Sequence, residues 1–140
     1  MDTIAHWING AAVPSTSGNT SPVYNPATGE QASLVGLASV AEVEAAVAAA
    51  KAAFPGWRST SLTKRAEIMF RFRELIDANK LKIATLVSNE HGKVVSDAMG
   101  EVSRGLENVE YACGISELIK GSYSEQAATG VDVYSIRQPL

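Results

Sequence analysis

The sequence predicts an α/β fold in which short β-strands at both ends of the chain flank about four helices. Three observations lead to this prediction. An Asn-Gly pair lies between apolar runs near the N-terminus, helical periodicity covers much of residues 39–113, and β-branched and aromatic residues at Val131–Gln138 predict a terminal strand. The chain has 140 residues, of which 46% are hydrophobic, so we expect one domain with its own core.

The N-terminal residues predict a β-hairpin followed by a strand. Asn9–Gly10 separates two short apolar runs, and both residues tolerate the positive φ of a tight type I′ turn. The polar stretch Pro14–Pro22 predicts a solvated loop. In Asn25–Glu30 the proline fixes φ and the glycine permits an unusual backbone angle, so we expect a turn that leads into a strand near Ala32–Leu37.

Capping and breaking residues mark the first three helices. Ser39 and Glu42 are spaced as a capping box at the start of the first helix, which we expect to end at Pro55–Gly56. A second helix is predicted over roughly Ser61–Ala78, where apolar residues recur on one side. A third is predicted over Lys80–His91, and the glycine that follows is suited to cap its C-terminus.

The fourth helix has the clearest periodicity in the chain. Its apolar positions advance by alternating steps of four and three residues and form one narrow stripe: Val95, Met99, Val102, Leu106, Val109 and Cys113. Arg104 lies almost opposite the centre of this stripe. Gly100 and Gly105 lie inside the helix, where each costs about 1 kcal/mol relative to alanine, so we expect another backbone to approach there.

Composition and charge argue against several classes of protein. The formal net charge is -3, from 12 basic and 15 acidic residues, so no excess of positive charge favours nucleic acid binding. Cys113 is the only cysteine, which excludes an internal disulfide and favours a reducing compartment, and we expect the cytoplasm. The sequence shows neither a signal peptide nor an apolar run of membrane-spanning length.

Few residues are candidates for catalysis or metal binding. A nucleophilic Cys113 needs access and an activating base, whereas its place on the apolar stripe predicts a buried, unreactive thiol. Autonomous thiol chemistry at Cys113 stays an alternative. His6, His91 and one cysteine are too scattered to predict a metal site. The glycine-rich phosphate-binding motifs of dinucleotide sites and P-loops are absent, so the residues themselves predict no nucleotide site.

Arg104 is the best candidate for a functional contact. Its guanidinium is planar and permanently charged, and it can bind a carboxylate through two hydrogen bonds. The alternative is an ordinary surface role, in which Arg104 pairs with Glu101 or Asn108 on the solvated face of the helix. The residues alone leave both interpretations open.

Four segments resemble the N-terminal part of an aldehyde dehydrogenase. They are INGAAV at Ile8–Val13, VYNPATGE at Val23–Glu30, NEHGK at Asn89–Lys93 and SRGLENVEYACGI at Ser103–Ile115. Their order and spacing make a more specific signal than any one of them alone. The last segment, together with ATGVDVYSIRQPL at Ala128–Leu140, is most similar to the CoA-acylating methylmalonate-semialdehyde dehydrogenase branch of that superfamily.

The resemblance implies a fold and an activity. Residues 1–130 would be the N-terminal, incomplete part of a dinucleotide-binding domain, and residues 131–140 would begin the oligomerisation arm of a homotetramer. The complete enzyme would oxidise malonate or methylmalonate semialdehyde with NAD and pass the acyl group to CoA, giving acetyl-CoA or propionyl-CoA in valine catabolism. Its catalytic residues and most NAD contacts would lie beyond Leu140. We therefore assign no catalytic, cofactor-binding or metal-binding residue in this chain and expect it to be inactive alone.

The resemblance also gives Arg104 a role, which is to hold the carboxylate of the semialdehyde substrate. A function of a different class stays open, namely an independent helical domain that binds a partner such as a dehydrogenase subunit through exposed apolar faces and the terminal strand. The downstream reading frame separates the two interpretations. Continuation into a glycine-rich strand supports part of an enzyme, whereas a natural stop after Leu140 supports the partner-binding domain.

Overall fold

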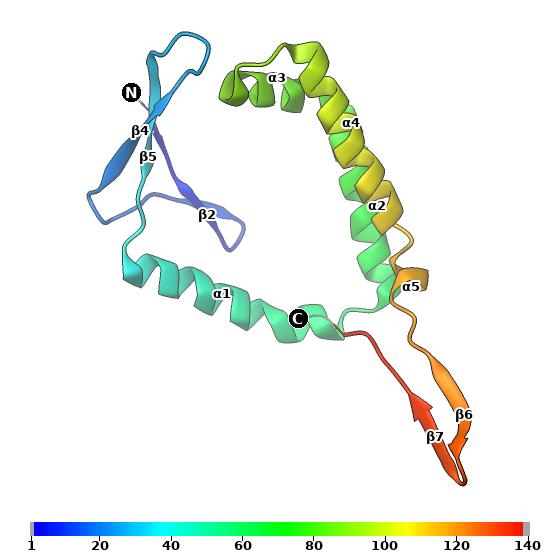
Figure 1. The fold of residues 1–140 in the computed structure, drawn as a ribbon. Helices are drawn as coiled ribbons and strands as arrows, with labels where there is room; N and C mark the ends of the chain where they lie inside the picture. Colours follow the sequence, from blue (N-terminus) through cyan, green and yellow to red (C-terminus); the bar gives the residue numbers. More distant parts are fainter. Residues whose placement is uncertain (1, 139–140) are drawn as a thin grey trace. The chain divides into compact units, whose positions relative to one another are not determined.

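The computed structural model describes residues 2–138, so Met1, Pro139 and Leu140 lie outside the described residues. Within the described chain, five short strands precede five helices and two further strands follow them (Figure 1). The α/β class predicted from the sequence is therefore confirmed. The chain divides into two compact units, the first formed by Met1–Trp57 and Thr85–Ala98 and the second by Arg58–Ala84 and Met99–Leu140.

The first unit contains two small sheets. A three-stranded sheet has the order β1 (Thr3–Ile4), β5 (Gln31–Gly36), β4 (Thr20–Tyr24), with β1 parallel and β4 antiparallel to β5. A two-stranded antiparallel sheet pairs β2 (His6–Ile8) with β3 (Ala11–Val13). The predicted N-terminal hairpin is therefore confirmed, as is the strand near Ala32–Leu37, which is displaced by one residue.

Two turns predicted from glycine positions are also confirmed. Asn9 and Gly10, between β2 and β3, have φ angles of 52° and 77°, and a type I′ turn requires positive φ at both positions. Gly29 has a φ angle of 75°, and its N–H donates to the carbonyl oxygen of Asn25 at 2.8 Å. This turn delivers the chain directly into β5.

The predicted solvated loop Pro14–Pro22 is wrong at its C-terminal end, because β4 begins at Thr20. Pro22 is tolerated within this strand because β4 is an edge strand and has one side without a pairing partner. The loop is also less solvated than predicted. The hydroxyls of Ser15 and Ser17 donate to the carbonyl oxygen of Leu37 at 3.0 and 2.5 Å, and both serines are half-buried.

Glu42 ties the same loop to the start of α1 (Val40–Ser59). The predicted capping box is confirmed, since the Ser39 N–H donates to Glu42 Oε2 at 2.7 Å and the Glu42 N–H donates to Ser39 Oγ at 3.3 Å. The Thr16 N–H donates to Glu42 Oε1 at 2.6 Å. Backbone N–H groups of Ser39 and Thr16 stabilise the carboxylate and lower the pKa of Glu42 to about 2.

The predicted end of the first helix at Pro55–Gly56 is wrong, because α1 continues through both residues to Ser59. Proline fixes φ at a helical value, so within a helix it removes one hydrogen bond and adds strain without forbidding the conformation. The extra turn finds a partner for one terminal carbonyl. Arg65 Nη2 donates to the carbonyl oxygen of Arg58 at 3.0 Å.

The other three predicted helices are confirmed within about one residue at each end. They are α2 (Leu62–Ala78), α3 (Lys80–His91) and α4 (Val95–Ala112). The Ser61 hydroxyl caps α2 by accepting from the Lys64 N–H at 3.4 Å, and Gly92 ends α3 with a φ angle of 84°. None of the described helices combines the length and the apolar character needed to cross a membrane.

The apolar stripe of α4 is confirmed in its middle and not at its start. Val102 and Leu106 are only 9% and 5% exposed, whereas Val95 is 37% exposed. A Cβ atom built on Gly100 or Gly105 meets no other atom of the described chain within 4 Å. The close approach of a second backbone that we expected at these glycines is therefore wrong for the part of the chain that the structure describes.

The C-terminal part of the second unit is a hairpin. After the short helix α5 (Ile115–Leu118), β6 (Tyr123–Ala128) pairs antiparallel with β7 (Val131–Tyr134) (Figure 1). The predicted strand Val131–Gln138 ends four residues early, at Tyr134, and the sequence analysis missed β6. The Asp132 carboxylate accepts from Tyr123 Oη at 2.7 Å and from the Gln126 N–H at 2.8 Å. These contacts bridge an irregularity in pairing between Ser124 and Ala128.

Candidate functional site

Arg104, the residue predicted to bind substrate, lies on the exposed side of α4. The backbone carbonyl oxygen of Arg104 accepts a hydrogen bond from Asn108 Nδ2 at 2.8 Å. Asn108, four residues further along the helix, therefore contacts the backbone of Arg104. Val102 and Leu106 face the opposite, buried side. The position predicted from helical periodicity is therefore confirmed, and it leaves a permanently charged guanidinium on an open helix face.

The remaining candidates, Cys113, His6 and His91, lie on or next to separate elements of the described chain. Cys113 follows the last turn of α4, is half-buried, and is a free thiol. His6 lies in β2, and His91 lies at the end of α3. Among residues 2–138, no set of three His, Cys, Asp or Glu side chains is arranged to hold a metal ion.

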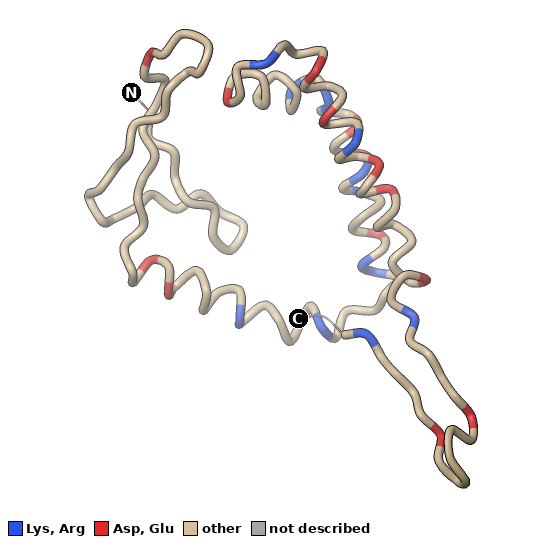
Figure 2. Tube along the Cα trace, viewed as in Figure 1, with Lys and Arg blue, Asp and Glu red and all other residues tan. Residues whose placement is uncertain are grey.

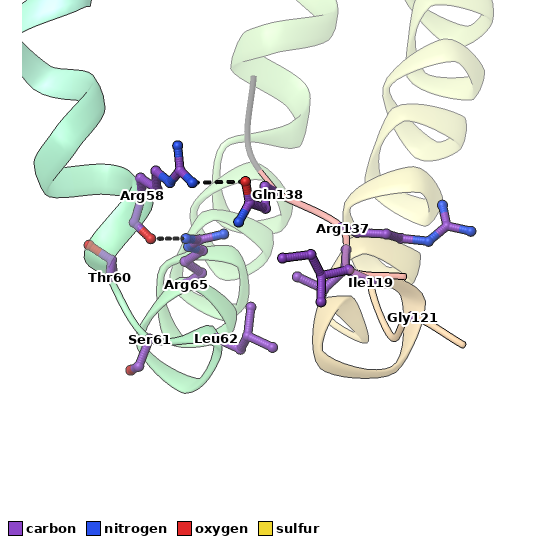
Figure 3. A pocket seen from close by; sticks show the side chains of 10 residues that line it. Arg58, Thr60, Ser61, Leu62, Arg65, Ile119, Gly121, Arg137 and Gln138 are labelled. Atoms are coloured by element: carbon purple, nitrogen blue, oxygen red, sulfur yellow. Dashed lines mark hydrogen bonds between the residues drawn. The ribbon is translucent and has the colours of Figure 1, made fainter. Parts of the chain in front are cut away.

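A second cluster of charge lies in the second unit, in an open cavity of about 380 Å³. We call it the arginine pocket, and its lining is Arg58, Thr60, Ser61, Leu62, Arg65, Ile119, Gly121, Ile136, Arg137 and Gln138 (Figure 3). Three of these ten residues are arginines, and none of the described lining residues is acidic. The described lining of the pocket therefore carries positive charge from its arginines and no negative charge from acidic side chains.

Hydrogen bonds to neutral groups hold two of the arginines in place. Arg58 Nη2 donates to Gln138 Oε1 at 2.8 Å, and Arg65 Nη2 donates to the Arg58 carbonyl oxygen at 3.0 Å. Figure 3 shows the side chains of Arg58 and Arg65 next to Gln138, while the guanidinium of Arg137 extends away from them. Arg65 is half-buried, and Arg58 and Arg137 are exposed. This arrangement can attract an anion from solvent.

Sequence reasoning missed the arginine pocket. Arg65 fell within the second predicted helix, Arg137 fell within the predicted terminal strand, and Arg58 received no role. Arg58 and Gln138 are 80 residues apart, so no local motif joins them. The only signal was that no aspartate or glutamate occurs between Glu44 and Glu67, a stretch that includes Arg58 and Arg65.

Comparison with known proteins identifies the class to which the chain belongs. The model of the family described as "Aldehyde dehydrogenase family" matches residues 12–140. This match covers nearly the whole sequence, and the chain belongs to the aldehyde dehydrogenase family. The resemblance carried by the four sequence segments is confirmed.

The similar proteins found include semialdehyde dehydrogenases of this family. The chain is 45% identical over 140 residues to a malonate-semialdehyde dehydrogenase from Pseudomonas aeruginosa, covering 100% of this chain and 28% of that protein. It is 46% identical over 137 residues to an acylating, mitochondrial methylmalonate-semialdehyde dehydrogenase from Arabidopsis thaliana, covering 98% of this chain and 23% of that protein. The chain thus spans about a quarter of the length of these relatives.

Solved structures agree with this placement. The crystal structure of methylmalonate-semialdehyde dehydrogenase from Oceanimonas doudoroffii matches with a TM-score of 0.93 and 50% identity, over 99% of this chain and 28% of that one. An NAD complex of a Sinorhizobium meliloti protein assigned to the same class matches with a TM-score of 0.93 and 45% identity, over 100% of this chain and 28% of that one. The fold of the described residues is therefore that of the corresponding part of these solved structures.

Proposed function

We propose that this chain is the N-terminal portion of an NAD-dependent, CoA-acylating malonate or methylmalonate-semialdehyde dehydrogenase. The observation that carries the proposal is the match along the whole chain, at 45% identity, to a malonate-semialdehyde dehydrogenase. Residues 1–130 are the proposed N-terminal part of the dinucleotide-binding domain, and residues 131–140 the start of the oligomerisation arm of a homotetramer. β7 (Val131–Tyr134), with which the proposed arm begins, is exposed along its whole length, which supports a role in association.

The proposed division of labour assigns binding and scaffolding to this chain. The sequence carries no glycine-rich phosphate loop, so its residues do not by themselves fit NAD, and no step of the oxidation is assigned to them. NAD and CoA are the proposed oxidant and acyl acceptor of the complete enzyme, with acetyl-CoA or propionyl-CoA as products. Inactivity of the chain alone and a cytoplasmic location stay predictions, and the Arabidopsis relative is named as mitochondrial.

Arg104 is the proposed contact for the substrate carboxylate. Its side chain is on the exposed face of α4, and the buried Val102 and Leu106 fix the rotation of that helix. A guanidinium on a rigid helix can form the two parallel hydrogen bonds that a carboxylate accepts. A semialdehyde acid carries such a carboxylate beside its aldehyde, and a simple aldehyde does not.

The substitution Arg104→Leu in a complete enzyme tests this proposal. We expect kcat/KM for malonate semialdehyde to fall roughly 100-fold and kcat/KM for a simple aldehyde such as propanal to change less than about threefold. Arg71→Leu, which removes another exposed arginine from this chain, is the matched control and should leave both values unchanged. Equal losses for the acid and the simple aldehyde would reject the carboxylate contact.

A partner-binding domain is the alternative function. One observation favours it, which is that large apolar side chains remain on the surface of the chain: Val43 is 52% exposed, Val47 is 50% and Leu75 is 62%. The same exposure is expected where the remainder of a dehydrogenase covers these faces. The two functions differ in whether the polypeptide continues in frame into the rest of an aldehyde dehydrogenase.

A further inference from the structure

We propose that the arginine pocket is a binding site for a phosphate group, either free phosphate or the phosphate of a phosphomonoester. The proposal is independent of the dehydrogenase function and of the carboxylate contact at Arg104. Arg104 lies on α4 and is not part of the pocket lining. The site is instead assembled from the end of α1, the start of α2 and the segment that follows β7.

The charge of the pocket favours an anion. Its lining places Arg58 and Arg65 next to Gln138, with Arg137 at the edge and its guanidinium directed away, and no aspartate or glutamate is among the described lining residues. An anion placed beside the guanidinium groups of Arg58 and Arg65 is attracted by both positive charges. Partial burial of Arg65 strengthens the interaction, because the surrounding dielectric is lower than that of water.

The donors favour phosphate among anions. Each guanidinium offers N–H groups in a fixed fork that matches two oxygens of a phosphate. The Gln138 amide accepts from Arg58 through Oε1, which leaves its NH₂ group as a further donor at the same place (Figure 3). A phosphate monoester has three terminal oxygens and a charge near −2 at neutral pH, so it can bind several such donors at once.

A close approach at Gly121 and local hydrogen bonds position the segment that lines one side of the pocket. Gly121 lines the pocket, and a Cβ atom at that position would overlap the carbonyl group of Ser135. The Ser135 N–H donates to the Ser122 carbonyl oxygen at 2.8 Å, and the Ser122 N–H donates to Ser135 Oγ at 3.0 Å. These contacts fix the segment that carries Arg137 and Gln138 next to the segment before β6.

Titration of the 140-residue chain with inorganic phosphate tests the proposal. Binding is followed by the ¹⁵N–¹H resonances of the arginine side chains at constant ionic strength, with acetate as a second anion and glycerol phosphate as a monoester. We expect saturable shifts of the Arg58 and Arg65 signals with phosphate and weaker ones with acetate. Tighter binding of glycerol phosphate than of phosphate indicates a phosphoester ligand, and the reverse order indicates free phosphate. No saturation with either phosphate compound overturns the proposal.

Three variants separate a specific site from general charge. Arg58→Gln should weaken phosphate binding about tenfold, since it removes one charge-assisted contact. Arg65→Gln should do the same, although it also removes the donor to the Arg58 carbonyl, so circular dichroism must show that it stays folded. If it does not, the exposed Arg58→Gln decides. Arg71→Gln removes the same charge from α2 outside the pocket and should bind as the parent does. Equal weakening by Arg58→Gln and Arg71→Gln, or no weakening by Arg58→Gln, overturns the proposal.

Discussion

In the second unit, the surroundings of Arg73 differ from those of the arginines in the arginine pocket. Arg73 on α2 lies among acids, with Nη2 at 2.9 Å from Glu110 and Nη1 at 3.0 Å from Glu74 and 3.4 Å from Asp77. The hydrogen bond that Arg73 donates to Glu110, followed by the one it donates to Glu74, raises the pKa of Arg73. In the arginine pocket, the contacts of Arg58 and Arg65 described above are to neutral oxygens. Figure 2 shows acidic and basic segments interleaved along α2 and α4.

The comparison teaches that position within a helix does not reveal what an arginine does. Arg65 and Arg73 lie on the same helix, and both are half-buried. Arg73 joins α2 to α4 because α4 presents Glu110, whereas Arg65 lies in a pocket with an uncharged or basic lining. The first arrangement pairs the arginine with acids, whereas the second places it in a pocket without an acidic residue among the described lining.

Among the substitutions in the arginine pocket, Gly121→Ala should cause the largest loss of stability. In Gly121→Ala the new Cβ would lie 2.7 Å from the carbonyl carbon of Ser135 and closer still to its oxygen, so backbone must move. We expect a loss of about 1 to 3 kcal/mol in the free energy of unfolding, as for other overpacking substitutions. Urea denaturation followed by circular dichroism measures it.

Gly100→Ala is the matched control for Gly121→Ala. It makes the same change inside α4, where a Cβ meets nothing within 4 Å in the described chain. Because alanine favours helix over glycine, this variant should gain about 0.5 to 1 kcal/mol. Similar losses for the two variants would contradict the close contact between Gly121 and Ser135.

Glu42 is an acidic counterpart of the pocket arginines, because neutral backbone N–H groups bind its carboxylate. Its folded pKa of about 2 lies below the ordinary value of 4.5, so the interaction stabilises the chain fully above about pH 4.5. That stabilisation falls as the pH drops from about 4.5 to about 2. We expect Glu42→Gln to be less stable than the parent at pH 7 and the difference to shrink across this window, as measured by urea denaturation at each pH. A difference that stays constant from pH 7 to pH 2.5 would contradict the lowered pKa.

Local signals predicted most of the fold. The Asn9–Gly10 turn, the capping box at Ser39 and the stripe of α4 depend on residues within a few positions of one another. The turn and the capping box are present, and the stripe is buried in its middle at Val102 and Leu106. The errors arise where distant residues decide the structure. Pro55 stays helical in a turn whose Arg58 carbonyl is bound by Arg65, and β6 exists because β7 pairs with it.

The candidate site was predictable to a smaller extent. Arg104 was found because a helical period places it opposite an apolar stripe, and that placement is confirmed. Its contact with substrate stays a prediction. The arginine pocket could not be found in the same way, because the hydrogen bond between Arg58 and Gln138 depends on how the end of α1 meets the segment after β7.

The smallest expected effect is the difference in salt dependence between the contacts of Arg73 and those of Glu42. The contacts of Arg73 join opposite charges on an exposed surface, so dissolved ions weaken them, whereas the N–H donors of Glu42 are neutral dipoles that ions affect less. We expect Arg73→Gln to cause a small loss of stability at 20 mM NaCl that largely disappears at 1 M NaCl. The loss in Glu42→Gln should persist in both. Urea denaturation of the parent, Arg73→Gln, Glu110→Gln and the double variant at the two salt concentrations measures the coupling directly. Coupling between Arg73 and Glu110 that is unchanged at 1 M NaCl would show that charge is not what joins α2 to α4.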